Sequence, residues 1–365
     1  MNNGEKSTHY FLGANSGEGF VSRFDELDCM LGLNRKIIIK GGPGTGKSRM
    51  IRRVAEHYEE KGKAVEYIHC SSDPDSLDGI IVDELGVCIA DGTAPHVLEA
   101  DLPGVRDSIV NTGDFWDEEA LAAEADAVAD LRKRIKHEYN SAYRMLKGAE
   151  RLKTDNFKIV DAGVKHDKLK AYAQRLIKKE IAFSANPSPY YYRRYLSGIT
   201  PRGVLMFWNT VRVLCDRIYM IDDEYGVGRY VLEELRAAAV LRRQNAIVCL
   251  CPLYEGEVIE HLLLPDLRLA FVTSNEYHAF TDEPYKRINM HRFYDGDVVR
   301  SHRNRIRFNK KTASALIGKS CETLEGIKVM HDKLESYYTR TMDFTKLEGL
   351  TRSVIDRLDG FAAEV

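Results

Sequence analysis

Residues 41–48 constrain this chain more than any other part of its sequence. They read Gly-Gly-Pro-Gly-Thr-Gly-Lys-Ser, with an apolar run at 36–39 before them. Apolar residues then recur at helical spacing until Gly62, which we expect to end the helix. In such a strand–loop–helix unit, backbone N–H groups converge on an anion, and the start of the helix adds partial positive charge. The segment therefore predicts a phosphate-binding loop.

The loop residues are expected to contact a nucleoside triphosphate, and two of them have specific roles. Lys47 would reach the β- and γ-phosphates as a catalytic residue, and the Ser48 hydroxyl would bind Mg²⁺. The residues expected to contact the nucleotide are Gly41, Gly42, Pro43, Gly44, Thr45, Gly46, Lys47, Ser48 and Arg49. No guanine-reading N-K-x-D pattern is present.

A degenerate copy of the loop lies at 223–230, where Asp-Glu-Tyr-Gly-Val-Gly-Arg-Tyr keeps two glycines but has Arg229 and Tyr230 in place of the lysine and serine. The spacing of 35–96 recurs without a gap at 217–278, an offset of 182 residues (223 − 41). Further matches follow at shifted spacings: Phe115-Trp116-Asp117 with Phe293-Tyr294-Asp295, and His166–Leu169 with His331–Leu334. We predict a duplicated domain whose second copy, with acids at 222–224, does not hold nucleotide.

The fold class predicted from this pattern is α/β, with two tandem domains at 1–186 and 190–365. Each would contain a Rossmann-like, mostly parallel sheet followed by a helical arm. In repeat 1 the arm is expected at 120–147 and 165–181, as an antiparallel hairpin interrupted around 154–163. Two prolines within 184–189 predict the linker, and the second arm is expected from 297 to 358.

Composition narrows the class of protein. The 365 residues contain no apolar run long enough to cross a bilayer, and the chain starts with polar residues, so we expect a cytoplasmic protein without a membrane partner. Seven cysteines without paired C-x-x-C motifs argue against a disulfide framework or a structural zinc site.

Charge is distributed unevenly along the chain. The net charge is −2, but 73–130 contains sixteen acids and one base, so this stretch carries −15 and the rest +13. The run 300–311 contains six Lys and Arg residues and no acid. It could contact nucleic acid, form a solvated helix face, or dock onto the acidic stretch.

Two acidic positions compete as the carboxylate near Mg²⁺. Residues 80–84 resemble the apolar run ending in Asp83-Glu84 of AAA+ ATPases, in which the glutamate is catalytic. Residues 87–91 predict a strand ending in Asp91. The copy retains an acid opposite Glu84 but has Thr273 opposite Asp91, so Asp91 is lost together with the lysine and serine of the loop. We therefore favour Asp91 as the metal-associated carboxylate, with the Asp83/Glu84 pair, and Glu84 as its catalytic member, as the alternative.

Other polar residues near the expected site are interpreted from the same comparison. Asp73, Asp75 and Asp78 have acidic counterparts in the copy, which favours a helix-start and surface role. The patch 69–72 changes chemical class and is a candidate for nucleotide sensing or for substrate contact. His96 is retained as His278, which indicates packing or hydrogen bonding in both repeats. Candidates for a trans-acting arginine from repeat 2 are Arg193, Arg194, Arg202 and Arg229.

The loop resembles that of the P-loop NTPase superfamily. Together with 12–15, 69–73, 91–96 and 115–117, it is similar to a family of bacterial tandem-repeat ATP-binding proteins. In that family the second repeat also tends to carry an intact loop, and this sequence departs there. The resemblance implies ATP and Mg²⁺ as cofactors and Asp91-Gly92 as a site element. The expected function is a Mg²⁺-dependent ATPase with a regulatory second repeat. The alternatives are a small-molecule or nucleotide kinase and a nucleic-acid-dependent ATPase.

Overall fold

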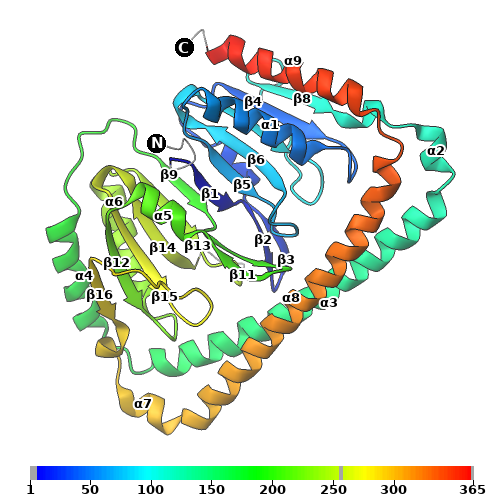
Figure 1. Cartoon of the computed structure of the whole chain (residues 1–365). Helices are drawn as coiled ribbons and strands as arrows, with labels where there is room; N and C mark the ends of the chain where they lie inside the picture. The colour runs from blue at the N-terminus through cyan, green and yellow to red at the C-terminus, as the bar shows by residue number, and fades with distance from the viewer. Residues whose placement is uncertain (1–5, 255–257, 363–365) are drawn as a thin grey trace.

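The computed structural model describes residues 6–254 and 258–362, and these contain two six-stranded sheets of the same design (Figure 1). The first sheet has the strand order β1(Thr8–Phe11)-β5(Glu66–His69)-β6(Leu77–Val82)-β7(Val87–Asp91)-β4(Arg35–Lys40)-β8(Asp107–Asn111). The second repeats that order as β9(Tyr191–Arg194)-β13(Ala246–Leu250)-β14(Ile259–Leu264)-β15(Leu269–Ser274)-β12(Arg217–Asp222)-β16(Lys286–Asn289). The duplication seen in the sequence therefore corresponds to two sheets of one topology.

Both sheets are mixed, whereas we expected mostly parallel sheets from the sequence. β6 runs antiparallel to β5 and to β7, and β14 does the same between β13 and β15. The remaining neighbours are parallel. The reason lies in the connections at 70–76 and 83–86, which are shorter than the dozen or so residues that a parallel crossover requires.

The loop's flanking elements form as the hydrophobic pattern predicts. All three isoleucines of β4 are fully buried, as expected for a central strand covered on both faces. Helix α1 (Lys47–Glu60) buries the predicted apolar face, namely Met50, Ile51, Val54, Ala55 and Tyr58. Gly62, just past the helix, has a φ of +78°, a conformation that glycine adopts without strain.

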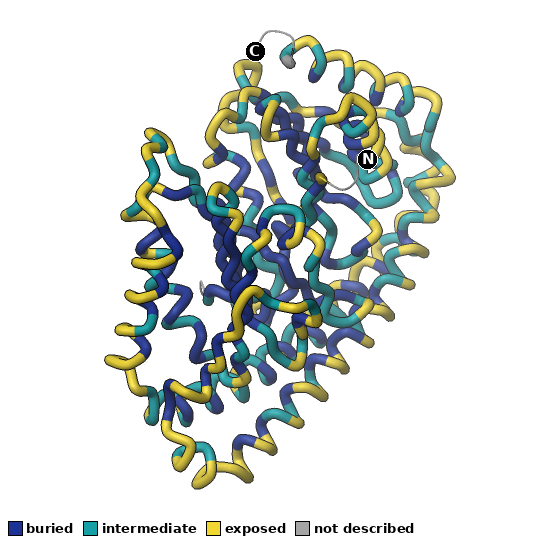
Figure 2. The backbone as a smooth tube through the Cα atoms, turned by 60° about the vertical axis from the view of Figure 1, so that its left-hand side comes forward, coloured by how far each residue is buried: buried dark blue, intermediate teal, exposed yellow. Residues whose placement is uncertain are grey.

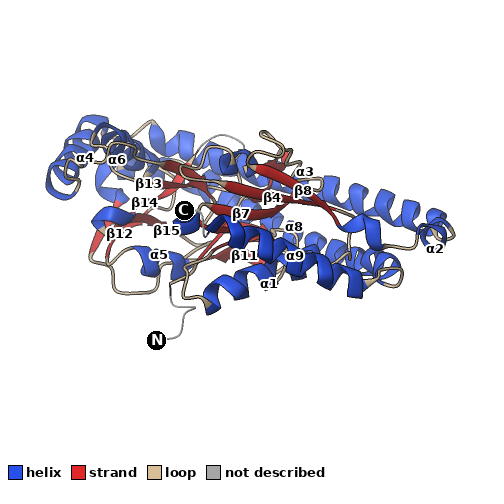
Figure 3. Ribbon diagram, turned by 90° about the horizontal axis from the view of Figure 1, so that it is seen from above, coloured by secondary structure: helices blue, strands red, loops and turns tan. Residues whose placement is uncertain are grey.

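The helical arms are exchanged between the repeats. α3 (Ala125–Asp161) and α8 (Arg303–Thr339) pack along each other in opposite directions and form one side of the molecule (Figure 1). α3 then leads to α4 (His166–Glu180), which packs on α6 (Arg229–Leu241) of repeat 2, and α8 leads to α9 (Phe344–Ala362), which packs on α1. In Figure 3, α1 and α9 lie together near the middle of the view, while α4 and α6 lie together at its left-hand end.

Three expectations about the arms were wrong. α3 continues without interruption to Asp161, and its partner along most of its length is α8 rather than α4. His166 starts α4, whereas His331 lies inside α8, so the segments His166–Leu169 and His331–Leu334 are not equivalent. A hydrophobic pattern shows that a helix has an apolar face, but it does not identify the helix that will cover that face.

The two hairpins, and the short helices that precede α3 and α8, occur in matching pairs. The hairpins are β2(Gly13–Ser16)–β3(Gly19–Ser22) and β10(Ser197–Thr200)–β11(Gly203–Met206). The short helices α2 (Glu118–Ala122) and α7 (Gly296–Ser301) precede the long ones, and α5 (Trp208–Leu214) follows β11.

The repeats join around an approximate two-fold axis. Phe11 and Tyr195 hold matching positions, and each donates its backbone N–H to the other's carbonyl oxygen, at 2.9 and 3.0 Å. One apolar cluster contains buried residues of both halves, including Tyr10, Leu12, Met220 and Leu263. Figure 2 shows the buried backbone concentrated in the strands of the interior. The two repeats thus share part of their core. Within 6–254 and 258–362, no helix combines the length and apolar character needed to cross a membrane.

Candidate functional site

The predicted phosphate-binding loop leaves β4 and enters α1 in a tightly curled conformation. Gly44 and Gly46 have φ values of +69° and +84°, in the left-handed region that residues with a side chain rarely adopt. Lys47 folds back over the loop, where its Nζ donates to the carbonyl oxygens of Gly41 at 3.2 Å and Gly42 at 2.6 Å. The Lys47 side chain therefore lies across the predicted phosphate-binding loop.

Asp91 lies beside this lysine. It ends β7 next to β4, paired in register with Ile39, and its carboxylate is 3.6 Å from Lys47 Nζ. The other carboxylate oxygen of Asp91 accepts from the Thr93 N–H at 2.8 Å, and Thr93 Oγ1 donates to Gly41 O at 3.1 Å. Loop, lysine and carboxylate therefore form one connected network.

Ser48, the expected Mg²⁺ ligand, is the second residue of α1. Its Oγ accepts a hydrogen bond from the backbone N–H of Leu77 at 2.9 Å, which ties the loop to the start of β6. Because a hydroxyl oxygen has two lone pairs, Ser48 Oγ can accept this hydrogen bond and still bind a metal ion. Ser48 and Asp91 are both oxygen donors, the ligand type that Mg²⁺ prefers.

Glu84 lies away from this loop, so the expectation that it could stand beside Mg²⁺ there in place of Asp91 is corrected. Because β6 is antiparallel to β7, Asp83 and Glu84 follow the end of β6 at the start of β7. Four residue steps of β7, about 13 Å, separate that edge of the sheet from Asp91. Glu84 is exposed there and pairs with Lys63 at 3.2 Å. The comparison of the two repeats could not show that β6 runs antiparallel to β7, and this direction places Glu84 and Asp91 at opposite ends of β7.

A buried acid–histidine pair was missed as a site element. Asp78, assigned to the surface from the sequence, is a buried residue of β6, and its Oδ1 lies 3.4 Å from His96 Nε2. Burial tends to lower the pKa of His96, but Asp78 outweighs it, helped by Asp91, and the pKa is raised. The joint retention of Asp78 as Glu260 and of His96 as His278 was the signal that could have revealed the pair.

The matching pair in repeat 2 is closer, because His278 Nε2 lies 2.8 Å from Glu260 Oε1. The histidine therefore has a buried acidic partner in both repeats. Asp75 is exposed and pairs with Arg202. The counterparts of Asp73 and Asp75, Glu255 and Glu257, lie outside the described residues.

In the second loop, a side chain occupies the position of an anion. Asp223, the counterpart of Gly41, is buried, and one carboxylate oxygen accepts from the N–H groups of Gly226 and Val227, both at 3.0 Å. The other oxygen accepts from Gly228 N–H at 2.7 Å. Arg229 turns to its own loop, donating to Gly226 O at 2.7 Å. The degenerate loop thus retains an anion-binding backbone and supplies its own carboxylate.

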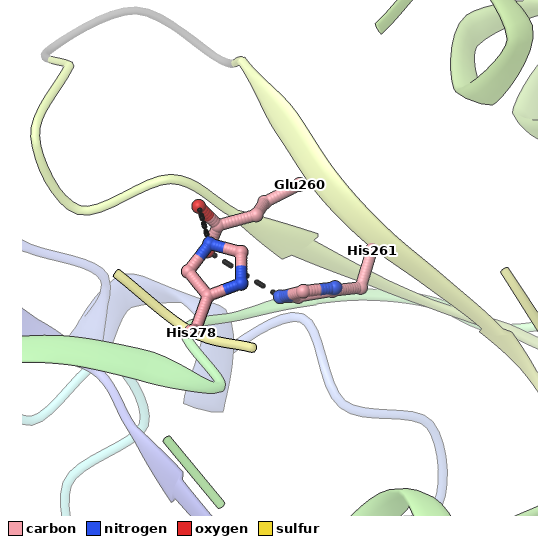
Figure 4. Close-up of side chains that lie close together, drawn as sticks. All are labelled: Glu260, His261 and His278. Carbon is pink, nitrogen blue, oxygen red and sulfur yellow. Dashed lines mark hydrogen bonds and ion pairs between the residues drawn. The ribbon is translucent and has the colours of Figure 1, made fainter. Parts of the chain in front are cut away.

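Glu260, His261 and His278 form a buried cluster beside this loop (Figure 4). A β-bulge at Glu260, where Ile259 and His261 pair with the consecutive residues Leu250 and Cys249, turns Glu260 and His261 toward each other. Their ligand atoms and those of His278 lie within 4.8 Å of one another, close enough for a metal ion.

The tautomer of His261 argues against a metal there. Its Nδ1 accepts a hydrogen bond from the Thr273 N–H at 3.2 Å, so the proton of the neutral ring resides on Nε2. Nε2 lies 3.4 Å from Glu260 Oε2 and can donate to it. Burial opposes ionisation of Glu260, but His278 and His261 outweigh that effect and hold its pKa well below the usual range. We interpret the trio as a hydrogen-bonded ionic cluster.

The four arginines considered as trans-acting residues are engaged elsewhere. Arg193 pairs with Glu26 and Arg194 with Glu66, in both cases between the two repeats. Arg202 pairs with exposed Asp75, and Arg229 stacks over Phe157 at 4.0 Å.

The patch 69–72 and the basic run are also occupied. His69 Nε2 lies 2.9 Å from His9 Nδ1, and Ser72 Oγ accepts from Tyr139 at 2.9 Å. In the basic run, Arg305 pairs with Asp155, and Lys310 pairs with Glu224 at 2.8 Å. The run therefore contacts acids other than those of 73–130.

Comparisons of the chain with protein-family models, with curated proteins and with solved structures give no match.

Proposed function

We propose that repeat 1 binds a nucleoside triphosphate, ATP by resemblance, together with Mg²⁺, and hydrolyses it, while repeat 2 is a regulatory partner without nucleotide. The observation that carries this proposal is the contrast between the two loops. The second loop holds the Asp223 carboxylate on its backbone N–H groups, whereas glycine stands at that position in the first. A backbone that binds a carboxylate in one copy is suited to bind phosphate in the other.

The residues of repeat 1 fit the roles that the reaction requires. The loop's N–H groups and the start of α1 would hold the phosphates, and Lys47 would move from the carbonyls of Gly41 and Gly42 to the β- and γ-phosphate oxygens. Ser48 and Asp91 would hold Mg²⁺ and its water shell, and the ion would neutralise charge on the phosphates.

The alternatives have less support. A kinase would need an acceptor pocket near 69–72, but His69 and Ser72 are hydrogen-bonded to other side chains. A nucleic-acid-dependent enzyme would use the basic run, part of which is paired with acids of the same chain. An ATPase turns over in water alone, so activity without added acceptor or nucleic acid favours it.

The test is ATP binding and turnover by the full chain. Lys47→Ala should weaken ATP affinity on the order of tenfold or more, because it removes a charge-assisted contact. Asp91→Asn should lower turnover more than Glu84→Gln. Arg229→Ala, the matched change in the second loop, should alter neither quantity. Equal losses in Lys47→Ala and Arg229→Ala, or two nucleotides bound per chain, would contradict the proposal.

A further inference from the structure

Helix α8 of repeat 2 lies directly against the phosphate-binding loop of repeat 1. Thr339 Oγ1 donates to the carbonyl oxygen of Gly44 at 3.2 Å. A Cβ atom at Gly44 would lie 2.6 Å from the carbonyl oxygen of Glu335, and one at Gly42 would lie 2.9 Å from the ring of Tyr338. The last turns of α8 therefore touch one end of the loop, and its glycines permit the close approach.

Lys328, on the same helix, marks the other end of the loop. Its Nζ lies 3.4 Å from Asp73 Oδ2, which accepts from Ser76 Oγ at 2.9 Å. The next residue, Leu77, donates its N–H to Ser48 Oγ. The eleven residue steps from Lys328 to Thr339 cover about 16 Å of helix. α8 thus passes from the Ser48 side of the loop to the Gly44 side.

His331 lies between these two contacts. Residues 328, 331 and 335 share one face of the helix, and all three are partly buried, whereas Asp332 and Lys333 are exposed. Burial lowers the pKa of His331, and the charges of Lys328 and Lys47 act in the same direction, whereas Asp332 and Asp73 oppose this shift. Glu335, whose pKa burial raises, faces the same groups.

Helix α3, the matching arm of repeat 1, supports the position of His331 beside the first loop. Lys153 holds the position in α3 that His331 holds in α8, since each is the twenty-ninth residue of a 37-residue helix. Lys153 lines a cavity of about 80 Å³ at the second loop, together with Asp223 and Arg229. In both halves a basic residue of the exchanged arm therefore faces the loop of the other repeat.

We propose that α8 of repeat 2 completes the nucleotide site of repeat 1, with Lys328 and His331 contacting the terminal phosphate. This inference rests on the proposed function. Lys328 also pairs with Asp332 on its own helix. The γ-phosphate would take the place of Asp73 as the partner of Lys328 from repeat 1, and its charge would favour the protonated form of His331. The trans-acting cations would then be a lysine and a histidine of the arm rather than an arginine of the sheet domain.

The experiment compares ATP and ADP binding by calorimetry in the full chain. Lys328→Met and His331→Asn should each lower the affinity for ATP by about tenfold and change the affinity for ADP little. Lys319→Met is the control, because Lys319 lies on the same helix but is exposed and pairs with Glu322. Wild-type protein should also take up protons on binding ATP near pH 7, seen as heats that depend on the buffer, and His331→Asn should not.

The outcomes separate the two proposals. If the wild type binds ATP but both variants keep its ATP-to-ADP preference, α8 packs on the loop without contacting the terminal phosphate, and this inference is overturned. If the wild type binds neither nucleotide, the proposed function fails and this inference with it. Thermal unfolding of each variant shows whether a loss of affinity reflects a loss of fold.

Discussion

At the scale of single residues, the two loops differ most in Asp223. Replacing it with alanine leaves buried N–H groups without an acceptor, and we expect the free energy of unfolding to fall by about 2–4 kcal/mol. Inorganic phosphate should restore stability to Asp223→Ala more than to the wild type, because an anion can then enter the loop. Urea unfolding with and without phosphate measures both effects. Glu224→Ala, an exposed neighbour paired with Lys310, is the control and should respond to phosphate like the wild type.

His96 predicts a pH dependence of stability. Despite burial, Asp78 raises the folded-state pKa of His96 above its unfolded value. The contribution of the pair is therefore fully present below about pH 6.5 and is lost as the pH rises through the folded-state pKa. The difference in melting temperature between wild type and His96→Gln should shrink as the pH is raised from 6 to 9. A constant difference would contradict the assignment, and exposed His137→Gln should show little difference throughout.

At the scale of elements, the contact between α8 and the first loop depends on Gly44. Alanine there has an unfavourable φ of +69° and meets the α8 backbone, so Gly44→Ala should cost about 1–3 kcal/mol. Gly349→Ala, inside α9 with open space around its Cβ position, should instead stabilise by about 0.5–1 kcal/mol. Chemical denaturation of both variants tests this opposition. Equal effects would contradict both the backbone strain at Gly44 and its contact with α8.

At the scale of the whole molecule, the exchanged arms and shared core predict that the two halves unfold together. The chain has two tryptophans, and Trp116 and Trp208 lie in different repeats. Variants retaining one tryptophan each, made by Trp116→Phe and Trp208→Phe, should give fluorescence transitions with coincident midpoints. A clear separation of the midpoints, after correction for the stability of each variant, would show that the repeats unfold independently.

The chain's local features could be predicted from its sequence. The β4 strand, the α1 helix and the turn at Gly62 follow from residues adjacent in the chain, whose preferences act over a few positions. The same holds for the glycine spacing of the first loop and its loss in the second. The duplication could also be predicted, because matching residues recur at equal spacing in the sequence and can be recognised without knowing which residues are in contact.

Tertiary structure alone decided which of these elements meet. The antiparallel direction of β6 brought Asp78 rather than Glu84 toward the loop edge, and the exchange of arms placed Lys328 and His331 of repeat 2 beside the loop of repeat 1. Amphipathic helices of similar composition can cover either sheet, so the pattern of each arm does not encode its partner. Long-range packing makes that choice, through the shared core and the bridges between Trp116 and Met342 and between Val164 and Tyr294.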